Sequence, residues 1–441
     1  MITSEEVREQ FLRFFTERGH QVVPSSSLIP ENDPSVLLTT AGMVQFKPYL
    51  MGQADPVAIF GSRDVCSIQK SFRTTDIEEV GDESHLTFFE MMGNFSFGGY
   101  FKEKAIALSA EFLTGRDGLS LDPKKIFVTA FKGDQEVTRD EEAIKLWQEQ
   151  FKALGLTAEI GERIFLYGKE KNWWELDPGP AGPDAEMFYD RGLSHDEQFG
   201  LKCHPNCDCG RFIEIGNDVF VQYYKTPEGK YETLKQRAVD NGRGFERLVM
   251  VLQGVPTIFE TDLFEPLRTR LAERAPNLTD RTRRIILDHV RSSAFLIADG
   301  VYPSNLERGY ILRRILRRLT LQCQQHGVQL ERLPELLAAV SEKYGAYYPE
   351  LINCERISRV ALDEAERFGQ VLTQGLRRFD RFVTANDSAE VLGEKLFTLY
   401  TSYGLPIEIS AEISRERGYS ITEASFRRYD DLFRKHQEIS H

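Results

Sequence analysis

Residues 68–102 read IQKSFRTTDIEEVGDESHLTFFEMMGNFSFGGYFK. Two β-prone runs, one ending near Arg73 and one over residues 87–91, flank an acidic loop that contains a glycine, which is a hairpin pattern. The loop is longer than a hairpin turn requires, and long ordered loops are usually functional. The guanidinium of Arg73 matches two anionic phosphate oxygens, and Phe88 or Phe89 offers an aromatic face to a purine. The stretch therefore predicts a nucleotide on a sheet surface, unless Arg73 only pairs with loop carboxylates and both phenylalanines belong to the core.

A second stretch, AVDNGRGFERLVMVLQG at residues 238–254, joins a strand to a helix through a glycine-rich turn. Such a turn is by itself a weak indication of phosphate binding, because N–H groups at a helix start attract anions. Taken alone, Asp240 reads equally well as a turn-capping residue, and Arg247 as half of a surface ion pair. Beside the first stretch, both residues favour one nucleotide site built from two distant segments.

The two stretches resemble motifs 2 and 3 of the alanyl-tRNA synthetases, which are class II aminoacyl-tRNA synthetases. The resemblance implies an α/β (α+β) fold, with a mainly antiparallel sheet flanked by helices over residues 1–255 and an all-helical tRNA-binding domain over residues 256–441. The amphipathic helical pattern that begins after Val255 agrees with this boundary. The resemblance does not extend to the family's editing and C-terminal oligomerising domains, so we expect a monomer.

The resemblance also implies how ATP would be held, together with Mg²⁺. Arg73 would contact the α-phosphate and Arg247 the γ-phosphate, while Phe88 or Phe89 would stack on adenine. The remaining residues implied at the ATP site are Glu186, near the adenine, and the two motif 3 glycines, Gly242 and Gly244.

Residues 172–190, NWWELDPGPAGPDAEMFYD, place two tryptophans before a Gly-Pro-Ala-Gly-Pro run. This run predicts a tight loop where the backbone can approach a small ligand, although adjacent tryptophans are more often core. The family resemblance implies that Asp240 accepts hydrogen bonds from the ammonium group of the amino acid. It further implies that Trp174, Asn217 and Val219 line the pocket for alanine.

Several positions depart from the family pattern. Ala181 and Asp184 stand where the Gly-Pro run usually carries cysteines, and Gly216 stands where the family has tryptophan. We expect the additional carboxylate of Asp184 to influence which amino acid is preferred, and Gly216 to leave space in the pocket.

A compact group of thiols and imidazoles lies at residues 195–209. Cys203, Cys207 and Cys209, with His204 or His195, have the composition of a zinc site. A bound metal would cross-link and stabilise an otherwise loose loop. Reduced buried thiols and redox chemistry are the alternatives.

The helical part carries a cluster of arginines in the run SSAFLIADGVYPSNLERGYILRRILRR, residues 292–318. A basic stripe is usually a solvated helix face, but clustering makes a local phosphate-binding surface credible. The run resembles the family's acceptor-stem recognition domain, in which Asn305 would contact a G·U wobble pair. Thr401 replaces the partner aspartate, which puts strict reading of that pair in question. The implied tRNA-binding residues are Asn305, Arg308, Arg313, Arg314, Arg317, Arg318 and Thr401.

Size and composition agree with an ordinary globular chain of two or three domains. The 441 residues are 41% hydrophobic and 28% charged, with a net charge of −13 that argues mildly against nucleic acid unless the basic residues are segregated. No apolar run approaches the roughly 20 residues of a membrane span, and the acidic, amphipathic start is unlike a signal peptide, so we expect a cytoplasmic protein.

These observations favour an enzyme that activates alanine with ATP and transfers it to the acceptor stem of alanine tRNA. One alternative is a paralogue that passes a small amino acid to another acceptor, as the departures at Ala181, Asp184, Gly216 and Thr401 suggest. A second alternative is a non-catalytic tRNA-binding module, against which the intact Arg73 and Arg247 argue.

Overall fold

The computed structural model describes residues 2–31, 33 and 36–440. The chain divides into two compact units. The first contains Met1–Glu78 and Asp82–Glu265, and the second contains Glu79–Gly81 and Pro266–His441. The predicted boundary at residue 255 therefore lies shortly before the observed one. Three residues of the loop between the two motif 2 strands belong to the second unit.

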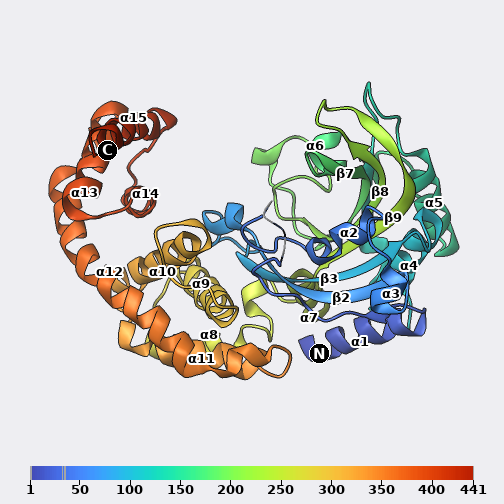
Figure 1. The fold of residues 1–441 in the computed structure, drawn as a ribbon, viewed down its shortest axis with the longest axis horizontal. Helices are drawn as coiled ribbons and strands as arrows, with labels where there is room; N and C mark the ends of the chain where they lie inside the picture. Colours follow the sequence, from blue (N-terminus) through green and yellow to red (C-terminus); the bar gives the residue numbers. More distant parts are fainter. Residues whose placement is uncertain (1, 32, 34–35, 441) are drawn as a thin grey trace. The chain divides into compact units, whose positions relative to one another are not determined.

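A nine-stranded sheet forms the centre of the first unit (Figure 1). Its order is β1-β2-β3-β9-β8-β7-β4-β5, with β6 paired to β7, and only the pairs β1/β2 and β4/β5 are parallel. This confirms the predicted mainly antiparallel sheet. The strands are β1 (Gln21–Val22), β2 (Asp64–Phe72), β3 (Phe88–Phe97), β4 (Ile126–Phe131), β5 (Ile164–Tyr167), β6 (Trp173–Glu175), β7 (Gly179–Asp190), β8 (Phe212–Lys225) and β9 (Tyr231–Gly244).

Strand pairing determines which side chains share a face of this sheet. Residues directly opposite each other on neighbouring strands point to the same side, and every second residue along a strand does so too. Asp240 on β9 is opposite Val219 on β8, and Gly242 is opposite Asn217. The four positions therefore share one face, although they come from two segments about twenty residues apart in the chain.

The opposite face of the sheet packs against two helices, α1 (Ser4–Glu17) and α4 (Lys102–Thr114) (Figure 1). The ring of Phe112 on α4 lies 5.5 Å from that of Phe11 and 5.2 Å from that of Phe14 on α1. Arg243, which is 1% exposed, donates to Asn94 Oδ1 at 2.7 Å and to Ser109 Oγ at 2.6 Å. This aromatic and polar packing holds β9 in place on the face of the sheet that α1 and α4 cover.

The sequence located most elements of the first unit. The first motif 2 strand ends at Phe72, as expected, and Arg73 is the first residue after it, whereas the second strand extends to Phe97. Helix and strand alternate after residue 102, also as expected. The other helices of this unit are α2 (Lys47–Leu50), α3 (Pro56–Phe60), α5 (Glu141–Ala153), α6 (Lys169–Asn172) and α7 (Phe245–Gln253).

The Gly-Pro-Ala-Gly-Pro run is not the predicted tight loop. It forms the first part of β7, paired with β6 on one side and β8 on the other. A register shift between Ala181 and Asp184 accommodates the run, since a bulge leaves a residue outside the regular pairing. A Cβ atom on Gly182 would lie 1.9 Å from Phe220 O, so a glycine is required by the close approach of β8.

Replacing Gly182 with alanine is expected to lower the free energy of unfolding by about 3 kcal/mol or more, since β8 must shift to admit the methyl group. The thermal midpoint, followed by circular dichroism, should fall by about 6–12 °C. Gly161→Ala is the matched control, because its Cβ meets nothing within 4 Å and only its backbone, with φ at +88°, is unfavourable. Equal shifts for the two variants would contradict the packing described here.

The second unit is helical, and its described residues contain no strand, as predicted. The long helix α12 buries Phe368, Leu372 and Phe379, which pack with Leu396 and Leu405 in one apolar core. The helices are α8 (Glu265–Arg274), α9 (Asp280–Ala298), α10 (Glu307–Gln325), α11 (Leu333–Tyr344), α12 (Cys354–Phe382), α13 (Ala389–Tyr403), α14 (Ile407–Glu416) and α15 (Glu423–Ser440). None of the helices in the part of the chain that the structure describes is long and apolar enough to cross a membrane.

Candidate active site

A pocket of about 920 Å³, counted with its open mouth, lies in the first unit, on the face of the sheet that carries Val219 and Asp240. It is lined by Ala41, Met43, Arg73, Asp76, Ser84, His85, Leu86, Phe89, Met91, Trp174, Glu214, Asn217, Val219, Asp240, Gly242, Gly244, Glu246, Arg247 and Ile258. The structure thus brings most of the predicted ATP and amino acid residues together around one cavity.

Two guanidinium groups from distant segments line this pocket. Arg73 follows β2, and its guanidinium carbon lies 4.8 Å from the centroid of the Phe89 ring. Arg247, on the first turn of α7, donates from Nη1 to Glu214 Oε2 at 3.1 Å and to Glu214 O at 3.2 Å. Arg73 is exposed and Arg247 is half-buried, so both are accessible to an anion of several phosphates.

The structure distinguishes the two adjacent phenylalanines. Phe88 is fully buried, whereas Phe89 is half-buried and lines the pocket. Phe89 is two residues before Met91, which also lines the pocket, so β-strand alternation turns Phe88 to the other face. Of the two candidates for stacking on adenine, only Phe89 is placed to do so.

The residues predicted to bind the amino acid also line this pocket. Trp174 and Val219 form its walls, and Asp240 lies beside them with 6% of its surface exposed. Burial raises the pKa of Asp240 to about 7. A ligand cation at this carboxylate would favour its ionised form, because an opposite charge nearby stabilises the anion. The neighbouring Trp173 is half-buried and packs on Phe131, so Trp174 lines the pocket and Trp173 does not.

The sequence analysis did not identify several polar residues of the pocket. Asp76, Ser84 and His85 come from the motif 2 loop, and Glu246 from the first turn of α7. His85 Nδ1 lies 2.5 Å from Asp82 Oδ2, and this contact raises the pKa of His85 above its usual value. A protonated imidazole would add positive charge near Arg247. For Asp76, Ser84 and His85, the signal in the sequence was their position near the two ends of the hairpin loop.

Three expected pocket residues lie outside the lining. Glu186 is half-buried and accepts a hydrogen bond from Thr129 Oγ1 at 3.2 Å, and burial next to Glu214 raises its pKa to about 9. Asp184 is 3% exposed and does not line the pocket, so its carboxylate is not part of the pocket wall. Gly216 leaves no space, because a Cβ there would lie 2.8 Å from Cγ of Arg243.

The structure places the thiol cluster in one spatial group. One ligand atom from each of His195, Cys203, Cys207 and Cys209 lies within 4.8 Å of the others. Tetrahedral zinc with bonds of about 2.3 Å separates thiolates by about 3.7 Å, close to the 3.5 Å between Cys203 Sγ and Cys209 Sγ. His195 Nε2 lies 2.8 Å from Gly200 O, which leaves Nδ1 for a metal. His204, the other candidate, instead has Nδ1 2.8 Å from the Tyr167 hydroxyl.

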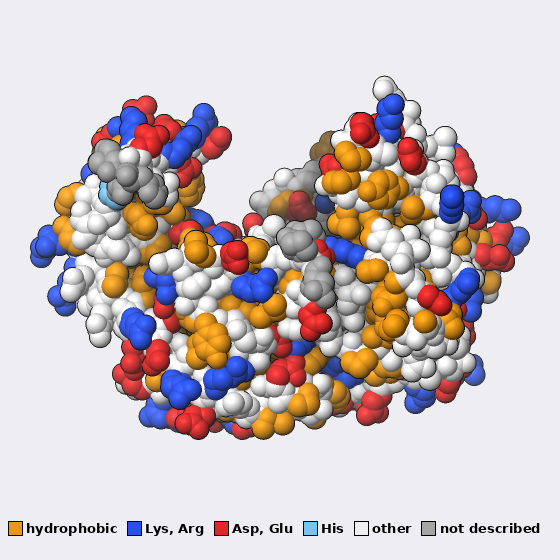
Figure 2. Space-filling model, viewed as in Figure 1, with side chains coloured by type: hydrophobic (Ala, Val, Ile, Leu, Met, Phe, Trp, Pro, Cys, Tyr) orange, Lys and Arg blue, Asp and Glu red, His pale blue; other side chains and the backbone are white. Residues whose placement is uncertain are grey.

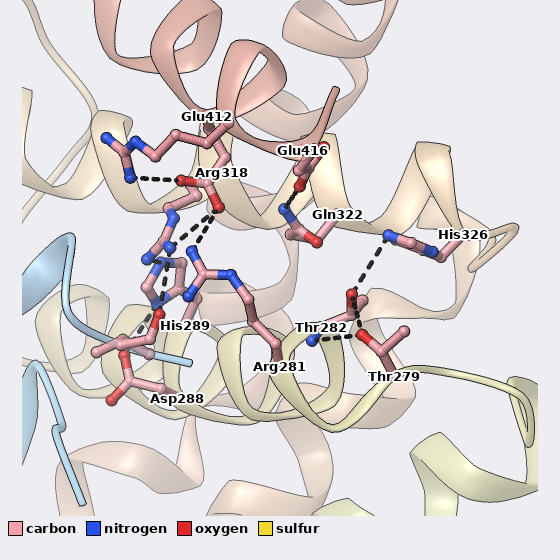
Figure 3. A network of polar contacts seen from close by, with 12 residues as sticks. Thr279, Arg281, Thr282, Asp288, His289, Arg318, Gln322, His326, Glu412 and Glu416 are labelled. Carbon is pink, nitrogen blue, oxygen red and sulfur yellow. Dashed lines mark hydrogen bonds and ion pairs between the residues drawn. The ribbon is translucent and has the colours of Figure 1, made fainter. Parts of the chain in front are cut away.

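The arginines of α10 in the second unit differ in accessibility. Arg318 is 3% exposed, and its Nη2 lies 3.2 Å from both Glu412 Oε1 and Val80 O, in the buried network of Figure 3. It therefore cannot belong to an exposed phosphate-binding face. Arg313 and Arg317 lie 3.0 and 3.3 Å from the carboxylate of Glu364.

The other predicted tRNA contacts lie at or near the surface. Arg308 and Arg314 are half-buried, and Asn305 is exposed and accepts a hydrogen bond from Arg313. Thr401 is exposed, and its hydroxyl donates to Phe397 O at 3.1 Å. Figure 2 shows basic and acidic side chains interspersed over the visible face of each unit. A phosphate-binding surface here would therefore depend on a few arginines.

The chain matches one protein family over nearly its whole length and has relatives of about 40% identity. Residues 6–440 match the family described as "tRNA synthetases class II (A)". The chain is 40% identical over 455 residues to "Alanine--tRNA ligase" of Treponema pallidum (strain Nichols), covering 100% of this chain and 72% of that protein. It is 43% identical over 444 residues to "Alanine--tRNA ligase" of Rubrobacter xylanophilus (strain DSM 9941 / JCM 11954 / NBRC 16129 / PRD-1), covering 96% of this chain and 48% of that protein. The solved apo histidyl-tRNA synthetase of S. aureus aligns with 61% of this chain and 75% of its own, at 12% identity and a TM-score of 0.34.

Proposed function

The chain belongs to the class II (A) tRNA synthetases, and from that premise we propose that it is an alanine–tRNA ligase. Its substrates would be ATP with Mg²⁺, alanine and the acceptor stem of alanine tRNA. The observation that carries the proposal is the convergence of Arg73 and Arg247, far apart in sequence, on one pocket that ends at Asp240, Trp174 and Val219.

The proposed reaction has two steps. An alanine carboxylate oxygen attacks the α-phosphorus of ATP, the bond to the bridging oxygen breaks, and pyrophosphate leaves with the electron pair. The terminal ribose hydroxyl of tRNA then attacks the activated carbonyl, loses its proton and releases AMP. No side-chain nucleophile is needed, because positioning and charge stabilisation supply the acceleration.

Each pocket residue has a role in this proposal. Arg73 neutralises the α-phosphate, where charge develops during attack, and Phe89 stacks on adenine. Arg247 moves from Glu214 to the γ-phosphate, which is a stronger anionic partner. Asp240 accepts hydrogen bonds from the alanine ammonium, and Trp174 limits the side chain to a small group.

Charging of an alanine tRNA transcript tests the proposal, with alanine-dependent ATP–pyrophosphate exchange measured alongside. We expect both activities. Exchange without charging would favour a paralogue that passes alanine to another acceptor. Failure of both would favour a tRNA-binding module without catalysis.

We also propose that zinc binds to His195, Cys203, Cys207 and Cys209. The donor set, the short sulfur–sulfur distance and the position of His195 Nδ1, 3.9 Å from Cys207 Sγ, support this site. The site's role would be structural, because four protein ligands complete a tetrahedron and leave no position for substrate.

Elemental analysis of freshly purified protein is expected to find about one zinc per chain, and chelation should lower the thermal midpoint because metal binding stabilises the folded loop. Cys203→Ser should lose the metal. Cys354→Ser is the matched control, because Cys354 is a free cysteine outside the cluster. Zinc near zero in the unmodified protein would leave reduced thiols as the better description.

A further inference from the structure

A buried carboxyl group lies behind the amino acid end of the pocket. Asp184 on β7 is directly opposite Val219 in the pairing of β7 with β8. Its Oδ2 accepts a hydrogen bond from Asn217 Nδ2 at 3.1 Å, and its Oδ1 accepts one from Asn172 Nδ2 at 3.1 Å. Asp184 does not line the pocket, but its partner Asn217 does.

The carboxylate determines which way the Asn217 amide points. An ionised carboxylate only accepts hydrogen bonds, whereas an amide donates at one end and accepts at the other. In the structure, Asn217 turns its NH₂ group toward Asp184. This leaves Oδ1 as the free end of the amide, and among the described residues this buried oxygen has no hydrogen-bond partner. A buried acceptor without a donor is unfavourable, so a ligand N–H group is favoured there.

We propose that Asp184 is a positioning residue, which holds the Asn217 amide with its oxygen free to accept a hydrogen bond from the substrate ammonium group. This inference rests on the proposed function. An ammonium group has three donors, and Asp240 on the same face of the sheet would accept another of them. Asp184 thus contributes to amino acid binding without touching the substrate.

The position of Asp184 is itself fixed by buried groups. Asn172, fully buried at the end of α6, donates from Nδ2 to Thr129 Oγ1 at 2.7 Å as well as to Asp184. Thr129 lies on β4, so the chain of hydrogen bonds joins β4, α6, β7 and β8. A carboxylate held from several elements can orient the amide more strictly than a mobile one.

Asp184→Asn tests the inference with a side chain of the same shape. The new amide has only one oxygen, so one of the two asparagine NH₂ groups would face another NH₂ group. In alanine-dependent ATP–pyrophosphate exchange we expect the KM for alanine to rise about tenfold or more, with the KM for ATP within about twofold of the unmodified value. A general structural defect would move both constants.

The double variant Asp184→Asn/Asn172→Asp moves the carboxylate to the other side of the same network. The carboxylate introduced at position 172 can accept a hydrogen bond from the amide introduced at position 184, whose oxygen is then available to Asn217. We expect the KM for alanine to return to within about threefold of the unmodified value. Asn172→Ala is the control, because it removes the other hydrogen bond of Asp184 and leaves the one to Asn217. It should lower the thermal midpoint and raise the KM for alanine less than Asp184→Asn does.

The outcomes separate this inference from the proposed function. An unmodified protein active with alanine, together with an unchanged KM for alanine in Asp184→Asn, would overturn the inference alone. If Asp184→Asn does not fold, the double variant Asp184→Asn/Asn172→Asp provides the test. A KM for alanine close to that of the unmodified protein supports the inference. A folded double variant whose KM for alanine is tenfold higher overturns it. An unmodified protein without alanine-dependent exchange would overturn both.

Discussion

Arg73→Ala is expected to reduce alanine-dependent ATP–pyrophosphate exchange by about 100- to 1,000-fold. Removing one positive group that stabilises charge in the transition state typically has an effect of this size. Arg73 is exposed at the end of β2 and contacts the Phe89 ring, so the fold should survive its loss. The thermal midpoint should therefore stay close to that of the unmodified protein, and the defect should appear mainly in turnover.

Arg139→Ala is the matched control for this experiment. Arg139 is also an exposed arginine of the first unit, but it pairs with Glu141 outside the pocket. Exchange by this variant should remain within about twofold of the unmodified rate, because exposed ion pairs contribute little. An Arg73→Ala enzyme with near-normal exchange would contradict the assignment of the phosphate site.

Asp240→Asn is expected to reduce kcat/KM for alanine by about 100-fold or more, because the ammonium loses a charge-assisted hydrogen bond in a buried site. The unmodified enzyme should show kcat/KM for alanine rising with pH and levelling off above about pH 7, where the carboxyl of Asp240 is ionised. The variant should lack this rise. A pH profile that is the same in both proteins would contradict the role of Asp240.

The same substitution is expected to make the protein more stable at high pH. Burial raises the pKa of Asp240 from 3.8 to about 7, so the folded protein binds this proton more tightly than the unfolded chain. The unfavourable contribution grows as pH rises from about 4 to 7 and is complete above pH 7. It amounts to about 4 kcal/mol, which the neutral amide removes. Thermal midpoints at pH 5 and pH 8 should therefore show a larger gain for Asp240→Asn at pH 8.

Much of the catalytic unit could be predicted because its two motifs contain several informative residues within short stretches of sequence. The glycine-rich turn before α7 and the long loop after Arg73 both identified segments that line the pocket. The sequence could not distinguish Phe88 from Phe89. Alternation tells which residues share a face, but only the packing of the whole sheet decides which face is buried.

The predictions that were wrong depended on contacts across the sheet. The Gly-Pro run reads locally as a loop, yet pairing with β6 and β8 makes it a strand. Gly216 suggested an open space, but the long side chain of Arg243 on the neighbouring strand occupies it. Tertiary pairing overrides local preference at such positions.

A similar limit applies in the helical unit. The cluster of arginines in residues 292–318 suggested one basic face, but α14 supplies Glu412 and buries Arg318. Helical periodicity gives the angular position of a side chain and not the partner that covers it.

Alanine-dependent ATP–pyrophosphate exchange, measured with each of the twenty amino acids in turn, tests the central claim most directly. We expect alanine to give by far the highest kcat/KM. Glycine and serine should follow, since one small group changes selectivity by only about 10- to 200-fold. Exchange with no amino acid, or with a large one in preference to alanine, would contradict the claim that Arg73, Arg247 and Asp240 form one site for ATP and alanine.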